Sequence, residues 1–136
     1  MAVELNRDAL RIGAAWRPGA GGRLTVEDPS TGELVGEIAA GDASDIDAAI
    51  AAARGAAEGE WGRLSAAERG RLLARLGALV ADHAEALAEI EMSDVGKPLR
   101  QARADVVALS RYLEFYGGAA DKVLGETIPY LAGYSV

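Results

Sequence analysis

One helix signal constrains this chain more than any other feature of its sequence. Ser65 stands three residues before Glu68, and at this spacing the two side chains satisfy each other's backbone amides as a capping box. Gly96 and Pro98 end the segment, because glycine accepts a left-handed terminal conformation and proline pushes the residue before it out of the α region. We therefore predict one long helix ending near Ser93, with a continuous apolar stripe formed by Leu72, Leu76, Leu79, Val80, Leu87 and Ile90.

Two other segments have helical spacing. Ser44 can cap the backbone N–H of Asp47 and open a helix over residues 45–58, whose apolar positions are Ile46, Ala49, Ile50, Ala53 and Ala57. Another helix ends near Gly117–Gly118, with its apolar positions at Leu99, Ala102, Val106, Leu109 and Leu113. Trp61 falls in the connection after the helix over 45–58, where we expect it to fill a gap between elements.

Short β segments flank the helices. Leu24–Val26 and Glu33–Ile38 surround the turn residues Asp28–Gly32, a pattern that predicts a β-hairpin. Val123–Ile128 and Gly133–Val136 are predicted as strands joined across Pro129, the last of them cut off by the chain end. The glycine-rich stretch 18–22 separates a flexible leader, residues 1–23, from the rest. The expected fold class is α+β, with an N-terminal hairpin, three helices and C-terminal strands.

Composition sets the size of the core and excludes several kinds of partner. At 136 residues the chain suits one domain, but much of its apolar half is alanine and it has only seven aromatic residues, so a thin core is expected. A net charge of −7 repels phosphate backbones, which argues against nucleic-acid binding. No apolar run approaches the roughly 20 residues of a membrane span. We predict a soluble cytoplasmic protein that binds neither nucleic acid nor membrane.

The residues offer little direct chemistry. No cysteine is present, which excludes a disulfide framework, a thiolate metal site and a cysteine nucleophile supplied by this chain. His83 is the only histidine and is predicted to be a solvated residue on the polar side of the long helix. Lys97 could contact a phosphate, but a surface lysine beside a helix stop is the simpler interpretation. No catalytic or cofactor-binding residue is assigned.

Other charged and aromatic groups also have ordinary explanations. The carboxylate pairs Asp45/Asp47 and Glu89/Glu91 have i, i+2 spacing, which points them to different helix faces, so they are predicted to be solvated charges. An aromatic cluster near the end of the last helix could line a ligand pocket, although core packing is its default interpretation: Tyr112, Phe115 and Tyr116.

From about residue 24 onward, the order of the segments resembles the aldehyde dehydrogenase superfamily. No single stretch is specific, but together they are in register over roughly 110 residues. The matching stretches are Asp28–Glu33 with Val35 and Ile38, Asp45–Arg54, Trp61 before Glu68-Arg69, Leu72–Leu76, Asp94-Val95-Gly96-Lys97-Pro98, Phe115–Lys122 and Gly125–Pro129.

The resemblance implies a place for each part in the α/β fold of that family. Residues 24–122 would form the N-terminal hairpin and helices of the cofactor-binding domain, and residues 123–136 the truncated start of the bridging strands that link subunits. In the family, the nucleophilic cysteine, the general-base glutamate, the oxyanion-stabilising asparagine and the lysine that holds the cofactor ribose lie beyond the matched segments. The resemblance therefore places no catalytic group in this sequence.

Two carry-overs from the resemblance remain. Some members hold a monovalent cation, Na+ or K+, through backbone carbonyls before the Asp-Pro-x-Thr-Gly turn and a carboxylate before Gly-Lys-Pro, which corresponds here to Val26, Glu27 and Asp94. The alternative is that Asp94 merely closes the helix end. Helix positions ahead of the aromatic cluster line the aldehyde entry tunnel in several relatives, which corresponds to Ala104 and Ala108.

The leading hypothesis is the N-terminal portion of an enzyme that oxidises an aldehyde to a carboxylic acid with NAD(P)+, through a thiohemiacetal and hydride transfer, and that is inactive alone. Its partners would be the remainder of an aldehyde dehydrogenase or related subunits in an oligomer. The alternative is a non-catalytic interaction or oligomerisation module derived from that family, which would dock through its unpaired C-terminal strand. A product of an interrupted gene is the third possibility.

Overall fold

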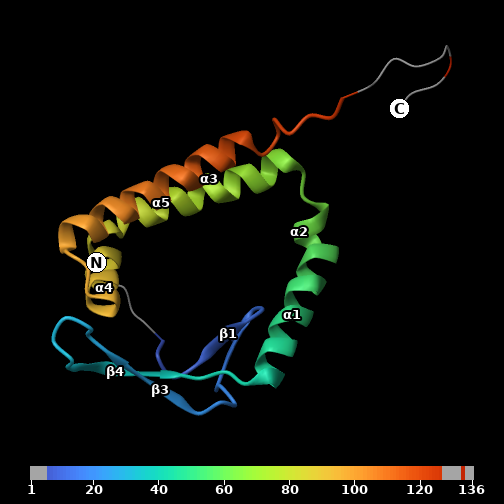
Figure 1. Cartoon of the computed structure of the whole chain (residues 1–136). Helices are drawn as coiled ribbons and strands as arrows, with labels where there is room; N and C mark the ends of the chain where they lie inside the picture. The colour runs from blue at the N-terminus through green and yellow to red at the C-terminus, as the bar shows by residue number, and fades with distance from the viewer. Residues whose placement is uncertain (1–5, 127–132, 134–136) are drawn as a thin grey trace.

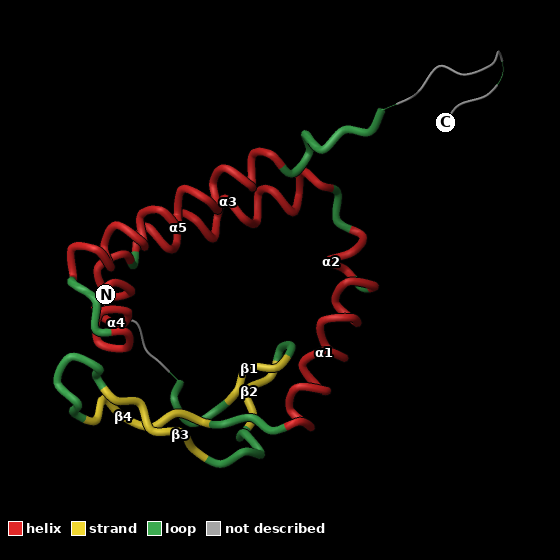
Figure 2. The backbone as a smooth tube through the Cα atoms, viewed as in Figure 1, coloured by secondary structure: helices red, strands yellow, loops and turns green. Residues whose placement is uncertain are grey.

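The computed structural model describes residues 6–126 and residue 133. Helices α3 and α5 lie side by side, α4 and α1 lead away from this pair, and two small sheets lie at the opposite side of the chain (Figures 1 and 2). Each sheet is a single antiparallel pair, so the predicted mixture of helices and small β-hairpins is confirmed. The elements are β1 (Leu10–Ile12), β2 (Ala15–Arg17), β3 (Arg23–Glu27), β4 (Leu34–Ala39), α1 (Ala43–Glu58), α2 (Glu60–Arg63), α3 (Ala66–Asp82), α4 (Ala84–Val95) and α5 (Leu99–Ala119).

Helices α3 and α5 pack closely against each other. A Cβ atom added to Gly70 on α3 would lie 2.3 Å from the carbonyl oxygen of Gly117 on α5. The Ser110 hydroxyl donates a hydrogen bond of 2.9 Å to the carbonyl oxygen of Gly77. Small residues at the crossing therefore let two backbones meet where larger side chains would hold them apart.

The predicted long helix is two helices. The Ser65–Glu68 capping box opens α3 as expected, but α3 ends at Asp82 and α4 begins at Ala84. His83 adopts φ −109° and ψ 15° between them, and its Nδ1 lies 2.9 Å from the Leu79 carbonyl oxygen. It is half-buried at a helix junction, which corrects the prediction of a solvated mid-helix histidine. Sequence periodicity continues across the junction, so it could not reveal the break.

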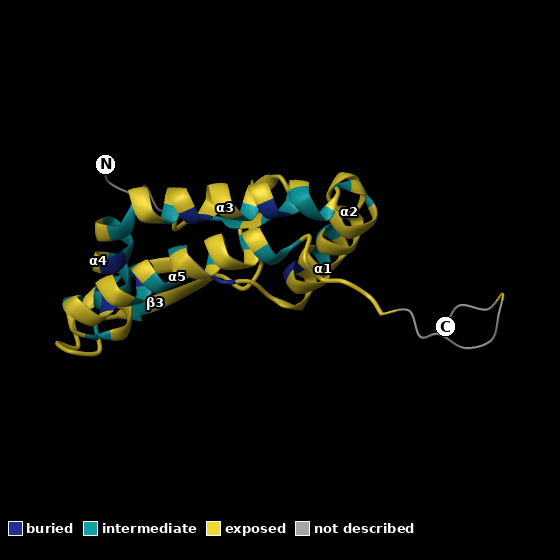
Figure 3. Ribbon diagram, turned by 90° about the horizontal axis from the view of Figure 1, so that it is seen from above, coloured by how far each residue is buried: buried dark blue, intermediate teal, exposed yellow. Residues whose placement is uncertain are grey.

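The break lets α4 turn and pack against α5. The buried core between α4 and α5 consists of Ala88, Ala102 and Val106. Five partly buried residues pack around this core: Val80, Ala84, Leu87, Met92 and Leu99. The predicted apolar stripe is consequently divided, because Leu87 joins this core while three leucines of α3 stay 42–54% exposed: Leu72, Leu76 and Leu79. Figure 3 shows that few of the described residues are buried, as the alanine-rich composition predicts.

Helix α1 begins differently from the prediction. Asp42, not Ser44, is the N-cap residue, and it forms a capping box with Asp45. The Ser44 hydroxyl instead donates to the Asp42 carboxylate. Aspartate and serine are both good cap residues, so cap preference alone does not decide between them.

Among the described residues, Asp45 is the one charged residue that is buried, with only 3% of its surface exposed. Its carboxylate accepts hydrogen bonds from the Ala20 N–H at 2.8 Å and from Arg17 Nη2 at 2.7 Å. These bonds lower the pKa of Asp45, the Ala20 amide contributing most and Arg17 next. The prediction that Asp45 is a solvated charge is therefore wrong. This carboxylate ties β2 and the loop after it to the start of α1.

The β3–β4 hairpin confirms the prediction for residues 24–38, with Leu24 opposite Ile38 in the register. The hairpin β1–β2 lies inside the expected leader, where no strand was predicted, and pairs Leu10 with Arg17. Residues 123–126 have no regular secondary structure, so the first predicted C-terminal strand is absent over that range. The rest of that strand and most of the final one, residues 134–136 included, lie outside the described residues.

Two smaller expectations concern single features. Trp61 lies in the short helix α2 and is 45% exposed, so it does not fill a gap in this chain. Among the described helices, none is both long enough and apolar enough to cross a membrane.

The α3–α5 crossing predicts opposite effects for two alanine substitutions. Gly70→Ala should lower the free energy of unfolding by about 1–3 kcal/mol, because the new methyl group collides with a backbone oxygen. Gly55→Ala on α1 is the matched control; it meets no atom within 4 Å and should raise stability by about 0.5–1 kcal/mol. Urea unfolding measures both, and equal midpoints for the two variants would contradict the close crossing.

The Asp45 hydrogen bonds predict a stability loss in acid. Because the folded-state pKa of Asp45 is lowered, its contribution is complete above the unfolded-state pKa of about 3.9 and is lost as the pH falls through the folded value. Asp45→Asn should therefore melt at a lower temperature at neutral pH and lose less stability on acidification than the unaltered chain. Asp47→Asn, also on α1 and exposed, is the control. Identical pH profiles for all three proteins would refute the assignment.

Candidate functional site

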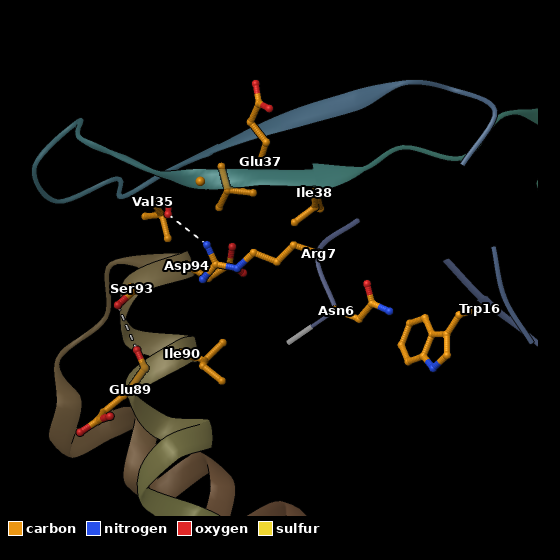
Figure 4. Close-up of a pocket in the computed structure, with 12 residues that line it drawn as sticks. Asn6, Arg7, Trp16, Val35, Glu37, Ile38, Glu89, Ile90, Ser93 and Asp94 are labelled. Carbon is orange, nitrogen blue, oxygen red and sulfur yellow. Dashed lines mark hydrogen bonds between the residues drawn. The ribbon is translucent and has the colours of Figure 1, made fainter. Parts of the chain in front are cut away.

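A cavity of about 560 Å³ lies between the β3–β4 sheet, helix α4 and the N-terminal segment. Its walls are largely apolar, and Figure 4 shows Val35 and Ile38 on β4 facing Ile90 on α4 across it. The lining residues are Asn6, Arg7, Trp16, Val26, Val35, Gly36, Glu37, Ile38, Glu89, Ile90, Ser93 and Asp94. Most of these residues come from segments far apart in the sequence, so the cavity is a product of the fold.

The tip of the β3–β4 hairpin positions one wall of this cavity. Gly96 ends α4 at φ +66°, and its N–H donates to the Met92 carbonyl oxygen at 2.9 Å. The Ser30 hydroxyl donates to the Gly96 carbonyl oxygen at 3.3 Å, which joins the Asp28–Gly32 turn to the end of α4. This contact brings together two motifs of the resemblance that are distant in the sequence, Asp-Pro-Ser-Thr-Gly and Gly-Lys-Pro.

The predicted cation ligands are only partly brought together. Val26 and Asp94 both line the cavity, whereas Glu27 is not among the lining residues. Within the described part of the chain, no group of three or more histidine or carboxylate side chains could hold a metal ion. A guanidinium also occupies the same cavity, because Arg7 Nη1 donates to the Val35 carbonyl oxygen at 3.3 Å. The monovalent cation at Val26, Glu27 and Asp94 therefore stays a prediction.

Sequence reasoning missed Arg7. The residue lies in the segment interpreted as a leader, and nothing in its local sequence distinguishes it from other arginines. Its backbone carbonyl accepts a hydrogen bond of 2.8 Å from the Ala39 N–H, so the segment runs along β4. Only this pairing shows that its side chain reaches the cavity.

Lys97 is not the free surface lysine that was predicted. Its ammonium group pairs with Glu91 and, at 2.9 Å, with Asp105, and only 26% of its side chain is exposed. Hydrogen bonds to Glu91 and then to Asp105 raise the pKa of Lys97. Glu91 is accordingly not an isolated solvated charge. These pairs connect the end of α4 to α5 across the loop that contains Pro98.

The predicted tunnel residues lie on α5, away from the cavity lining. Ala104 is exposed and Ala108 is half-buried. Spacings of three and four residues place both on the helix face that carries Tyr112 and Phe115. Phe115 and Tyr116 meet edge to face with ring centroids 5.3 Å apart, and the three aromatic residues of this cluster are 61–66% exposed. The prediction that the cluster packs in a core is wrong for this chain.

The sequence and the fold match known proteins over nearly the whole chain. The sequence profile described as the aldehyde dehydrogenase family matches residues 16–136. The chain belongs to the aldehyde dehydrogenase family. This confirms the resemblance on which the segment assignments depend.

Individual members agree in sequence and in structure. The mitochondrial aldehyde dehydrogenase family 2 member B4 of Arabidopsis thaliana is 41% identical over 137 residues, covering 98% of this chain and 26% of its own length. A candidate aldehyde dehydrogenase of Burkholderia cenocepacia superposes with a TM-score of 0.88 at 57% identity, covering 91% of this chain and 26% of its own. A double mutant of the betaine aldehyde dehydrogenase of Staphylococcus aureus, solved with NAD+, superposes with a TM-score of 0.87 at 30% identity. The match covers 93% of this chain and 26% of that protein. The chain thus spans about a quarter of the length of these aldehyde dehydrogenases.

The end of α4 predicts a further substitution effect. Gly96→Ala should destabilise the chain by about 1–2 kcal/mol, because residue 96 is left-handed and an added Cβ would lie 2.7 Å from Ser30 Oγ. Gly118→Ala on α5 is the control, since a Cβ there meets nothing within 4 Å. Thermal melts monitored by circular dichroism would measure both. A Gly96→Ala melting temperature at or above that of the unaltered chain would show that the turn does not dock on α4.

Proposed function

We propose that this chain is the N-terminal portion of an enzyme that oxidises an aldehyde to a carboxylic acid with NAD(P)+, and that it is inactive alone. The observation that carries the proposal is the match with the family over residues 16–136. The chain spans 26% of the length of a full relative, the Arabidopsis thaliana protein. The family's nucleophile is a cysteine, and this sequence contains none. The nucleophile and general base would be supplied by the other parts of a complete enzyme.

The exposed apolar surface supports a larger assembly. Large hydrophobic residues that are 42–66% exposed cluster on three helices: Ile46 and Ile50 on α1, Leu72, Leu76 and Leu79 on α3, and Tyr112, Phe115 and Tyr116 on α5. Within each helix these residues stand three or four positions apart and so share a face, and exposed apolar faces mark surfaces that pack against protein. We assign the covering role to the remaining parts of the aldehyde dehydrogenase fold, in the same protein or in a related subunit.

The parts of the chain would then have separate roles. Residues 24–122 would form the hairpin and helices at the start of the cofactor-binding domain, and residues 123–136 would begin the strands that bridge subunits. Ala104 and Ala108 would line one rim of the aldehyde entrance, where their small side chains leave space. NAD(P)+, when bound to the complete enzyme, supplies the hydride acceptor. A cytoplasmic location and an oligomeric state belong to this proposal as well, and the monovalent cation at Val26, Glu27 and Asp94 stays a prediction.

Fragment complementation tests the proposed function. The purified chain should produce no NADH from NAD+ and a panel of aldehydes. Mixed with the part of the Burkholderia cenocepacia relative that follows the position aligned with Val136, it should associate and restore NADH formation. Turnover by the chain alone, or failure of the two parts to associate in size-exclusion chromatography with light scattering, would contradict the proposal.

A pair of variants makes the assay specific for the α3 surface. Leu76→Glu places a charge on the exposed leucine stripe and should weaken association at least about tenfold, because the charge would be buried in the complex. Ala78→Glu adds the same charge on the other flank of α3, beside Arg71 and Arg75, and should complement normally. Equal behaviour of the two variants would exclude the leucine stripe as the contact. Self-association of the chain without catalysis would favour the oligomerisation module instead.

A further inference from the structure

Residues 10–20, which we call the clasp, are hydrogen-bonded to the rest of the chain through one carboxylate. The clasp comprises the β1–β2 hairpin and the start of the loop that follows it. Within the described part of the chain, two hydrogen bonds connect the clasp to other residues, and both end on Asp45. Arg17 Nη2 donates to Asp45 Oδ1 at 2.7 Å, and the Ala20 N–H donates to Oδ2 at 2.8 Å.

The apolar contacts of the clasp are small. The tip of the hairpin lies beside α1, where a Cβ at Gly13 would be 3.5 Å from the Cβ of Ala52 (Figure 2). Leu10 is half-buried, and its Cδ1 lies 3.3 Å from the position that a Cβ of Gly41 would take. No residue of the clasp is buried, and Trp16 is 51% exposed. Segments with so few buried apolar contacts open at a lower free energy than the core.

Asp45 is held at the start of α1 independently of the clasp. Its carboxylate accepts from the Asp42 N–H at 3.2 Å, and its own N–H donates to the Asp42 carboxylate at 3.2 Å. The capping box therefore keeps the carboxylate in place when the clasp is detached. Water can then solvate both Asp45 and Arg17, so the bonds between them have a modest net effect and their loss is reversible.

We propose that the clasp opens and closes as a unit on the Asp45 carboxylate while the helices stay folded, and that it thereby controls access to the cavity beside β4. Trp16 belongs to the clasp and lines the cavity, so opening removes part of the cavity wall (Figure 4). The core between α4 and α5 contains no residue of the clasp, so the helices do not depend on its attachment.

Hydrogen exchange of the unaltered chain tests the separate opening without aldehyde or NAD+, so its outcome is independent of the proposed function. Amide exchange is measured by NMR at increasing urea concentrations. The clasp amides, Ala20 included, should be at least about tenfold less protected than those of α5 and should depend less on urea, because a local opening exposes little surface. Equal protection and equal urea dependence in the clasp and α5 would overturn the proposal.

Asp45→Asn tests the role of the carboxylate. Asparagine keeps one acceptor oxygen but presents an NH2 group in place of the other, so it cannot hold Arg17 and Ala20 together. The clasp amides should lose at least about tenfold in protection while the helical circular dichroism is retained. Asp47→Asn removes the same charge from an exposed position on α1 and should behave like the unaltered chain.

The fluorescence of Trp16 reports on access to the cavity. In a Trp61→Phe background Trp16 is the only tryptophan, and Asp45→Asn should make it easier to quench with acrylamide, whereas Asp47→Asn should not. Unchanged quenching or unchanged clasp protection in Asp45→Asn would overturn the proposal. Loss of helical circular dichroism in Asp45→Asn would also overturn it, because the helices are proposed to stay folded without the clasp.

Discussion

The close contact of α3 and α5 is the constraint on which the rest of this structure depends. Gly70 and Gly117 allow the two backbones to meet, and Ser110 adds a hydrogen bond to the carbonyl of Gly77. With that pair in place, the break at His83 turns α4 onto the first half of α5, where Ala88, Ala102 and Val106 form the core. The end of α4 then becomes the platform for the β3–β4 turn. The cavity lies between the sheet and α4 because each of these contacts positions the next element.

Small residues give this crossing its geometry but bury little area. Each alanine in the core contributes little apolar area, and the charged contacts Asp45–Arg17 and Lys97–Glu91/Asp105 join elements that the apolar core does not reach. Many of the larger apolar side chains, by contrast, lie on the surface. A chain that exposes leucines and aromatic residues on its helix faces is suited to packing against further protein. This distribution agrees with its length of about a quarter of an aldehyde dehydrogenase.

The cavity brings together residues that no single motif of the sequence contains. The motifs around Val26 and Asp94 bring one edge of the sheet to the end of a helix. In this chain a side chain from the N-terminal segment also enters that space and brings its own positive charge. Family resemblance transfers the backbone arrangement reliably because the folds superpose. The resemblance supports the assignment of a bound ligand only when every group that lines the site is known, and here these groups include Arg7.

The sequence by itself determined the features that depend on neighbouring residues. The Ser65–Glu68 cap, the left-handed Gly96, the Asp28–Gly32 turn and the extent of α5 all follow from interactions within a few residues, and family membership followed from the order of such segments. Tertiary structure decided which groups are buried or paired. Asp45 and Asp47 look equivalent in sequence, but only Asp45 meets Arg17 and Ala20, which are 28 and 25 residues away. The leucines of α3, Lys97 and Arg7 were misjudged or missed for the same reason, because their surroundings come from distant segments that periodicity and local motifs do not encode.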